Sequence, residues 1–341
     1  MDELLFDLNK LIIDPKFEET IKELNEIEVS LPEFTNNIVF DNNDSFFTNN
    51  GQLVTPEKEI DKIKLNPKNT FQFLNDFSIL GYDESIFNFN SLEGSAYFTS
   101  HSLILLGKED YIPINYLTFY FYTRSKQIKE KSKYIKFSND PIMSSKKDYI
   151  KDKISFLEQA TPKQSLLLID GPLIGGDVYT YMIRAIEKFS NRNIIPIFFV
   201  KNSSSNMVTD NIAEIRSKFN SDMHWSYNYL NEGECTNCFK YIDKVNPDNA
   251  KIFLYMKPFN ISPQRIEMHV QTYLKYKNLL PNILDTIYYL ILVQGKIKNP
   301  QVRLIAIAEI FARSILKMVN VDKLIKEVGI TPTINQTRFG W

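Results

Sequence analysis

Three carboxylates in the sequence occupy positions from which they could hold a metal ion. Asp170 ends the apolar run SLLLID (165–170) and precedes Gly171, and functional groups of α/β sheets commonly lie at this end of a buried strand. Glu158 stands at the edge of the apolar face of a predicted helix and could point inward. Glu93 stands beside a predicted Gly turn, where a carboxylate can approach a phosphate or a metal closely. Taken singly, each is better explained as a turn, cap or solvent-facing residue.

Together, the three carboxylates suit a divalent metal. Mg²⁺ and Mn²⁺ prefer hard oxygen ligands, and a pair of such ions can clamp the attacking and leaving oxygens in phosphodiester hydrolysis. The chain has only 3 His, which disfavours a zinc hydrolase. Cys235 and Cys238 form a lone C-x-x-C pair, for which a packed loop is favoured over a metal site. There is no Walker loop, G-x-G-x-x-G motif or Ser nucleophile elbow.

The composition is that of a folded soluble protein. The chain has 341 residues, of which 43% are hydrophobic and 24% charged, and this length allows about two domains or one large domain. A formal net charge of −1 excludes a histone-like basic binder but not a local basic groove. The 2 Cys exclude a disulfide scaffold. An acidic start and the lack of a long apolar run predict a cytoplasmic protein without a membrane partner.

The elements that must position the carboxylates alternate between strands and helices. Residues 86–107 predict two strands joined by a turn, and residues 111–125 predict a third strand. A helix is expected to begin at Ser144 or Ser145 and to run to about Ala160. Further patterns predict strands at 165–170, 194–201, 251–259 and 265–270, and helices at 178–192, 208–219, 278–293 and 300–327. The strand, helix and strand between 165 and 201 form a β-α-β unit, so we expect a mixed α/β sheet.

Three parts of the chain differ in character. Residues 1–75 are predicted to be an N-terminal helical and irregular extension. Apolar residues have helical spacing in the first 30 residues, and residues 31–75 are Asn-rich and predict loops with one strand at most. Residues 76–330 are predicted to form the main domain and residues 331–341 a tail. Two basic segments, 126–137 and 144–153, mix Lys with Tyr and Phe. Such segments could contact a DNA backbone, or could be solvated helix faces.

At this point the arrangement resembles the NurA nuclease family over roughly residues 86–325. The strongest part is SLLLIDGPLI, followed by a helix and by IIPIFFVKNSSS. It is similar to the family's second Asp-Gly motif and the strand after it. KISFLE is similar to the helix that carries the family's Glu, SPQRIEMHV to an Arg-x-Glu strand, and VRLIAIAEIFAR to the C-terminal helix.

The resemblance implies an RNase H-like mixed β-sheet core flanked by helices. It also implies a Mn²⁺- or Mg²⁺-dependent nuclease that acts on DNA ends, and a homodimer docked on a HerA-type hexameric ATPase, in end resection during repair or in anti-phage defence. Asp170 and Glu158 would then be metal ligands. The family's first motif is Asp-Gly-Ser, and its counterpart here is Glu93-Gly94-Ser95, with Asp41 as an alternative first ligand.

Other positions leave the function more open. Lys201, at the end of the strand after Asp170, could contact a phosphate or could be a solvated strand end. Gln301 and Glu309 stand where the family usually carries a Tyr and a His. Two alternatives follow: a non-catalytic adaptor of the ATPase that keeps the fold, and another RNase H-like nuclease that acts on a different nucleic acid.

Overall fold

The computed structural model describes most of the chain from residue 52 onward. The described residues are 52–107, 110–130, 135–174, 180–211, 215–216, 218–244 and 246–320, together with 323, 327, 331 and 333. The predicted N-terminal helices and Asp41 lie outside them.

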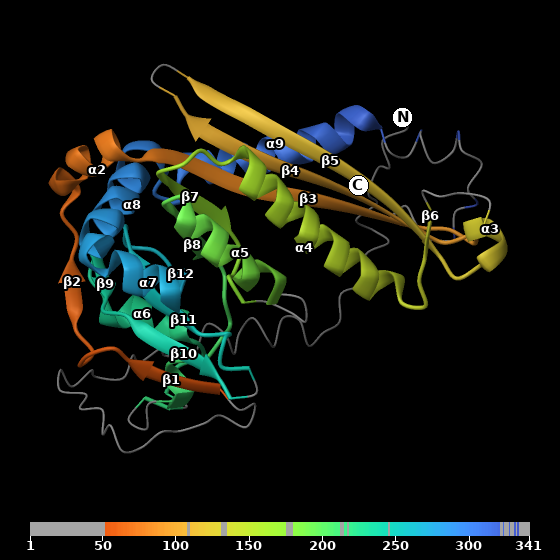
Figure 1. Ribbon diagram of the computed structural model, residues 1–341. Coiled ribbons are helices and arrows are strands. Elements are labelled where there is room, and N and C mark those ends of the chain that lie inside the picture. Colours follow the sequence, from red (N-terminus) through yellow and green to blue (C-terminus); the bar gives the residue numbers. More distant parts are fainter. Residues whose placement is uncertain are drawn as a thin grey trace, which may run out of the picture. The chain divides into compact units, whose positions relative to one another are not determined.

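Twelve strands of the described chain form one mixed sheet (Figure 1). In chain order they are β1 (Gln52–Pro56), β2 (Lys62–Lys64), β3 (Ser78–Asn90), β4 (Ser95–Leu106), β5 (Tyr111–Thr123), β6 (Ile135–Phe137), β7 (Ser165–Asp170), β8 (Ile194–Val200), β9 (Glu234–Thr236), β10 (Phe239–Asp243), β11 (Lys251–Lys257) and β12 (Gln264–His269). The order across the sheet is β1-β10-β11-β12-β8-β7-β3-β4-β5-β6, and β9 joins β2 to β11.

The centre of the sheet has the predicted RNase H-like arrangement. Strands β3, β4 and β5 form a long antiparallel meander, while β3 pairs in parallel with β7, and β7 with β8. In the order β5-β4-β3-β7-β8, β4 alone therefore runs against the others. All seven residues of β8 are buried, which is typical of a parallel strand covered on both faces.

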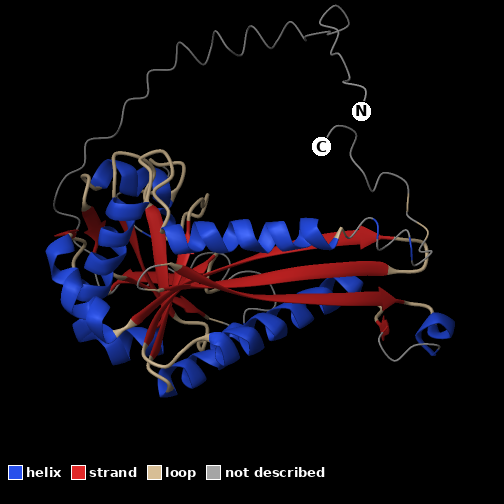
Figure 2. Cartoon of the chain, turned by 90° about the horizontal axis from the view of Figure 1, so that it is seen from above, coloured by secondary structure: helices blue, strands red, loops and turns tan. Residues whose placement is uncertain are grey.

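Helices cover both faces of this sheet (Figure 2). They are α2 (Thr70–Asp76), α3 (Lys126–Glu130), α4 (Pro141–Ala160), α5 (Thr180–Asn191), α6 (Asp222–Tyr229), α7 (Val270–Tyr276), α8 (Leu280–Gln294) and α9 (Arg303–Val319). On what we call the α4 face, α4 and α5 pack on even-numbered β3 residues, such as Leu80 and Tyr82. On the opposite α9 face, α8 and α9 pack on Ile79 and on Leu166 and Leu168 of β7.

Gly81 lets α9 lie directly on β3. A Cβ atom at this position would lie 2.5 Å from Leu304 Cβ and 2.6 Å from the Leu304 carbonyl carbon. Any side chain larger than hydrogen would therefore push the helix away from the sheet. The contact fixes α9 over the strand that carries the candidate site.

Several predicted elements need correction at their ends. Helix α4 begins at Pro141 rather than at Ser144 or Ser145, because Asp140 caps it by accepting a hydrogen bond from Met143 N (3.0 Å) and proline suits the first helical position. Strand β3 begins at Ser78, eight residues before the predicted start at residue 86. Of the helix predicted over 208–219, the residues that the structure describes show one 3₁₀ turn, at Thr209–Asn211.

Residues before 76 contribute to the sheet. Strand β1 pairs with β10, and β2 pairs with β9, so this stretch holds two strands and α2 where the sequence predicted largely irregular structure. The domain boundary after residue 75 stays a prediction. No helix in the described ranges is long and apolar enough to cross a membrane.

Candidate active site

Asp170 and Lys201 meet at the ends of two neighbouring parallel strands. Asp170 is the last residue of β7, and Lys201 directly follows β8. Lys201 Nζ lies 2.8 Å from Asp170 Oδ2, and both side chains are partly exposed. Gly171, which follows with a φ of 91°, donates its N–H to Asp170 Oδ1. The structure therefore places Asp170 at the open end of a buried strand, as its sequence position predicts.

Asp83 is the acidic neighbour of Asp170, and the sequence analysis missed it. The parallel register aligns Tyr82 with Ile169, so Asp83 stands at the position next to Asp170. Both side chains project toward the α9 face, because they alternate with Tyr82 and Ile169 on the α4 face. Asp83 is only 8% exposed. Burial, followed by the charges of Asp170 and Glu84, raises the pKa of Asp83 to about 7.

The acidic pair Asp83–Asp170 also has an unsatisfied hydroxyl beside it. Ser102 of β4 is the register partner of Asp83 on the side away from β7. Its Oγ is buried and has no hydrogen-bond partner in the described chain, and the same holds for Ser100 Oγ. The site thus combines two carboxylates with a hydroxyl that lacks a donor or acceptor.

This donor set suits a hard divalent cation. Mg²⁺ in proteins is often held by one or two carboxylates, with water and substrate phosphates as the other ligands. The described residues contain no group of three or more His, Cys, Asp or Glu side chains that could hold a metal. A cation at this site would therefore take further ligands from outside the carboxylate pair.

Asp83-Glu84-Ser85 is a closer counterpart of the family's first Asp-Gly-Ser motif than Glu93-Gly94-Ser95. It keeps the Asp and the Ser, and it replaces Gly by Glu84. Glu84 points to the α4 face, where it accepts a hydrogen bond from Tyr149 and lies 3.2 Å from Lys153 Nζ. One signal could have revealed this motif: two acidic residues inside the apolar run SILGYDESIF, where strands are depleted in Asp.

Glu93 lies in the turn between β3 and β4, away from Asp170. Seven residues separate Asp83 from the end of β3 at Asn90, which corresponds to about 23 Å of strand. The Glu93 carboxylate accepts a hydrogen bond from Thr331 N (3.0 Å), and this bond lowers the pKa of Glu93. The structure therefore does not bring Glu93 to the acidic pair.

Glu158 also lies apart from the acidic pair, on the other face of the sheet. Its Oε2 atom is 3.0 Å from Lys188 Nζ of α5. Its neighbour on α4, Leu157, packs on the α4 face, whereas Asp170 projects to the α9 face. The predicted ligand set Glu93, Glu158 and Asp170 is thus not assembled; Asp83 is the carboxylate that joins Asp170.

The predicted Arg-x-Glu strand forms a buried charge network on the α4 face. Glu267 is fully buried and accepts from Lys251 Nζ (2.6 Å) and Arg265 Nε (2.8 Å). It also accepts from Leu173 N (2.9 Å), in the turn after Asp170. Burial alone would raise the pKa of Glu267, but Lys251 and Arg265 outweigh it and hold that pKa below its usual value. Glu267 therefore ties the segment after Asp170 to β12.

The two cysteines are core residues. Cys235 and Cys238 are free thiols, both buried, and burial raises the pKa of Cys238 to about 12. Buried thiols of this kind pack as small apolar side chains; Cys235 does so within strand β9 rather than in the loop that the sequence suggested.

A family match covers the Asp170 half of this site. Residues 149–313 match the NurA domain. This part of the chain, somewhat less than half of it, is thus similar to the NurA domain. The match runs from α4 through Asp170 to α9, and it supports a nuclease. It begins downstream of Asp83, so the first motif is assigned here from the geometry. No curated protein sequence is significantly similar to the chain.

The solved structures that align with the chain share little sequence with it. The NurA nuclease from Sulfolobus solfataricus aligns at 10% identity and a TM-score of 0.47, over 77% of this chain and 86% of that one. Endonuclease V from Bacillus subtilis aligns at 10% identity and a TM-score of 0.37, over 76% of this chain and 88% of that one. A NurA structure with manganese aligns at 8% identity and a TM-score of 0.27, over 63% of this chain and 85% of that one.

Proposed function

We propose that the protein is a divalent-metal-dependent deoxyribonuclease that hydrolyses phosphodiester bonds at DNA ends. One observation carries this proposal. Asp83 of β3 and Asp170 of β7 stand side by side, just beyond the last paired residues of these two strands, and residues 149–313 of the chain match the NurA domain. A buried carboxylate next to a second one is costly unless a cation compensates it. The raised pKa of Asp83 expresses this cost.

In this proposal the acidic pair binds the cation and Lys201 serves the substrate. Asp83 and Asp170 would hold Mn²⁺ or Mg²⁺, which supplies Lewis-acid stabilisation of charge on the phosphate when bound. A cation on Asp170 would release Lys201 from its present ion pair, and the lysine could then contact a phosphate oxygen. Glu267 would keep the segment after Asp170 in place through Leu173 N.

The direct test is cleavage of end-labelled DNA in the presence of Mn²⁺. We expect Asp170→Asn and Asp83→Asn to lower the rate by about 100-fold or more, since groups that stabilise developing charge contribute at this level. Asp110→Asn serves as the matched control, because it also exchanges a carboxylate for an amide but is exposed just before β5, away from both the acidic pair and the end of the hairpin that carries Glu93. Equal losses in all three variants, or an unchanged rate in Asp170→Asn, would contradict the proposed site.

The partner proposals depend on the family resemblance alone. We propose that the protein acts as a homodimer on a HerA-type hexameric ATPase, in DNA end resection or defence against phage. Co-purification of the wild-type chain with such an ATPase would test this. Folded protein that binds the ATPase but cleaves neither DNA nor RNA ends would instead favour the adaptor alternative. Cleavage of RNA ends alone would favour the other RNase H-like nuclease.

A further inference from the structure

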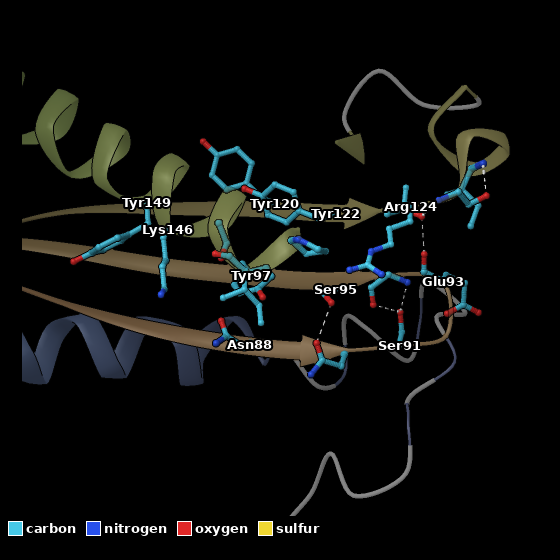
Figure 3. Close-up of a pocket in the computed structure, with 18 of the residues that line it drawn as sticks. Asn88, Ser91, Glu93, Ser95, Tyr97, Tyr120, Tyr122, Arg124, Lys146 and Tyr149 are labelled. Atoms are coloured by element: carbon cyan, nitrogen blue, oxygen red, sulfur yellow. Dashed lines mark hydrogen bonds between the residues drawn. The ribbon is translucent and has the colours of Figure 1, made fainter. Parts of the chain in front are cut away.

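A groove of about 780 Å³ lies on the α4 face of the β3–β5 meander, next to the first half of α4 (Figure 3). Strands β3 and β4 and the turn between them line one part of it, and the end of β5 and the start of α4 line the rest. None of its residues belongs to the acidic pair. The groove begins at Ile86, three residues or about 10 Å along β3 from Asp83.

Tyrosine rings line the groove. Tyr97 stands edge-on to Tyr122, with ring centroids 5.6 Å apart. The hydroxyls of Tyr120 and Tyr122 donate to Asp152 and Asp148, which fixes both rings. Tyr97 is half-buried and forms no hydrogen bond through its hydroxyl within the described chain. The contact with Tyr122 therefore holds the Tyr97 ring in place, and part of the ring remains exposed to the groove.

Two cations that pair with no acidic side chain of the described residues flank these rings. Arg124 follows β5, and Lys146 is in the first half of α4; both side chains are exposed and line the groove. No ion pair joins either of them to a described residue. The two basic segments singled out in the sequence, 126–137 and 144–153, thus meet at this groove, since Ile128 and Lys146 both line it.

The acidic side chains nearest the groove are already engaged. Asp148 accepts from Lys136 Nζ (2.7 Å) as well as from Tyr122. Asp152 accepts from Tyr120 at 2.7 Å. Glu93 at the rim accepts from Thr331 N. The two unpaired charges that line the groove are therefore positive.

A polymer strand could reach this groove from the acidic pair around an open edge. Strand β7 pairs with β3 only as far as Tyr82, whereas β3 continues to Asn90. Beyond Asp83, no described strand pairs with β3 on the β7 side. In the path that we infer, a chain held at Asp83 and Asp170 would pass from the α9 face to the α4 face across this edge, alongside Glu84 and Tyr149.

We propose that the groove binds single-stranded DNA, with a base stacked on Tyr97 and backbone phosphates on Arg124 and Lys146. Stacking on an aromatic ring combined with unpaired cations is the general chemistry of sequence-tolerant binding to single strands. The direction of the strand, from the acidic pair to the groove, rests on the proposed nuclease function. Binding in the groove itself does not.

The test is fluorescence anisotropy of a labelled oligothymidylate with the full-length protein in EDTA, so that cleavage cannot occur. Tyr97→Ala is expected to weaken binding about tenfold, the range seen for one stacked base. The double variant Arg124→Gln/Lys146→Gln is expected to flatten the slope of log affinity against log salt by about 1.4, which is about 0.7 for each lost phosphate contact. Lys163→Gln is the control, because Lys163 is an exposed lysine before β7, at the end opposite Asp170.

Two outcomes would overturn the inference. The first is wild-type affinity and salt slope in folded Tyr97→Ala and Arg124→Gln/Lys146→Gln. The second is equal weakening by Lys163→Gln, which would mean diffuse electrostatic binding. Asp83→Asn leaves the groove residues unchanged, so it is expected to bind the oligonucleotide as the wild type does. If it does so, but the wild type fails to cleave DNA with Mn²⁺, the nuclease proposal is contradicted and the groove proposal is not. If wild type cleaves but the groove variants bind normally, the groove proposal fails alone.

Discussion

Two charge clusters among the described residues lie on opposite faces of one sheet, and they are built differently. On the α4 face, Glu267 is fully buried between Lys251 and Arg265 and accepts a backbone N–H as well. On the α9 face, Asp83 is nearly buried beside a second carboxylate, with one lysine that bonds to Asp170 instead. In the first cluster the buried carboxylate has two cations beside it, whereas in the second two carboxylates share one lysine. We call the first cluster compensated, because the charge of its buried carboxylate is offset within the protein, and the second uncompensated, because it keeps an excess of negative charge that a cation could offset.

The largest expected effect in this comparison is on the compensated cluster. Glu267→Gln removes the carboxylate that pairs with both buried cations, Lys251 and Arg265, so we expect the free energy of unfolding to fall by about 3–5 kcal/mol. Urea unfolding of the purified variant measures this. Glu309→Gln is the matched control, since it removes a carboxylate from an exposed pair with Arg313 and should cost less than about 1 kcal/mol. A similarly small change in Glu267→Gln would contradict the structural role.

Removing a carboxylate from the uncompensated cluster should instead raise the free energy of unfolding. In metal-free protein, Asp83→Asn is expected to raise the free energy of unfolding by about 2 kcal/mol at pH 8. The folded-state pKa of about 7 exceeds the usual value of about 3.9. The wild-type carboxyl therefore favours folding fully below pH 4, and this contribution is lost as the pH rises to 7.

The gain of Asp83→Asn should consequently vanish near pH 4 and grow toward pH 8. Urea unfolding in EDTA at several pH values measures it. Excess Mn²⁺ should reduce this gain in the free energy of unfolding, because the bound cation would then offset the charge of Asp83 in the wild type. If Asp83→Asn were less stable than the wild type at pH 8 without metal, the Asp83 carboxylate would not be an uncompensated charge, and this interpretation would be wrong.

The smallest expected effect concerns Glu158, a carboxylate in neither cluster. Its partner Lys188 is 66% exposed, and such pairs contribute little. Glu158→Gln should change the free energy of unfolding by less than about 1 kcal/mol and leave the rate of DNA cleavage within about twofold of wild type. A loss comparable with that of Asp170→Asn would restore Glu158 as a ligand.

Much of the fold follows from local sequence patterns. The apolar runs of β7 and β8 and the helix between them predicted the β-α-β unit, and the position of Asp170 at its strand end followed directly. The alternating pattern after residue 86 predicted the β3–β4 hairpin. These features are set by periodicity and by turn residues, both of which are local.

The acidic pair could not be found in the same way. Asp83 and Asp170 are 87 positions apart in the chain and meet only through the parallel register of β3 and β7. The sequence pattern did not predict residues 78–85 of β3, which include Asp83. Glu93-Gly94-Ser95 is similar in sequence to the family motif, but it lies in the turn between β3 and β4. Glu158 was misplaced for a related reason: its edge position on α4 does not reveal that the helix covers the other face of the sheet.

The most direct measurement is Mn²⁺ binding by the full-length protein, followed by electron paramagnetic resonance of the free ion. The wild type and Glu93→Gln should bind with equal affinity, whereas Asp83→Asn and Asp170→Asn should each bind about tenfold more weakly or worse, since even residues that only support ligands contribute about tenfold. Weakening by Glu93→Gln with no effect of Asp83→Asn would contradict the acidic pair as the metal site.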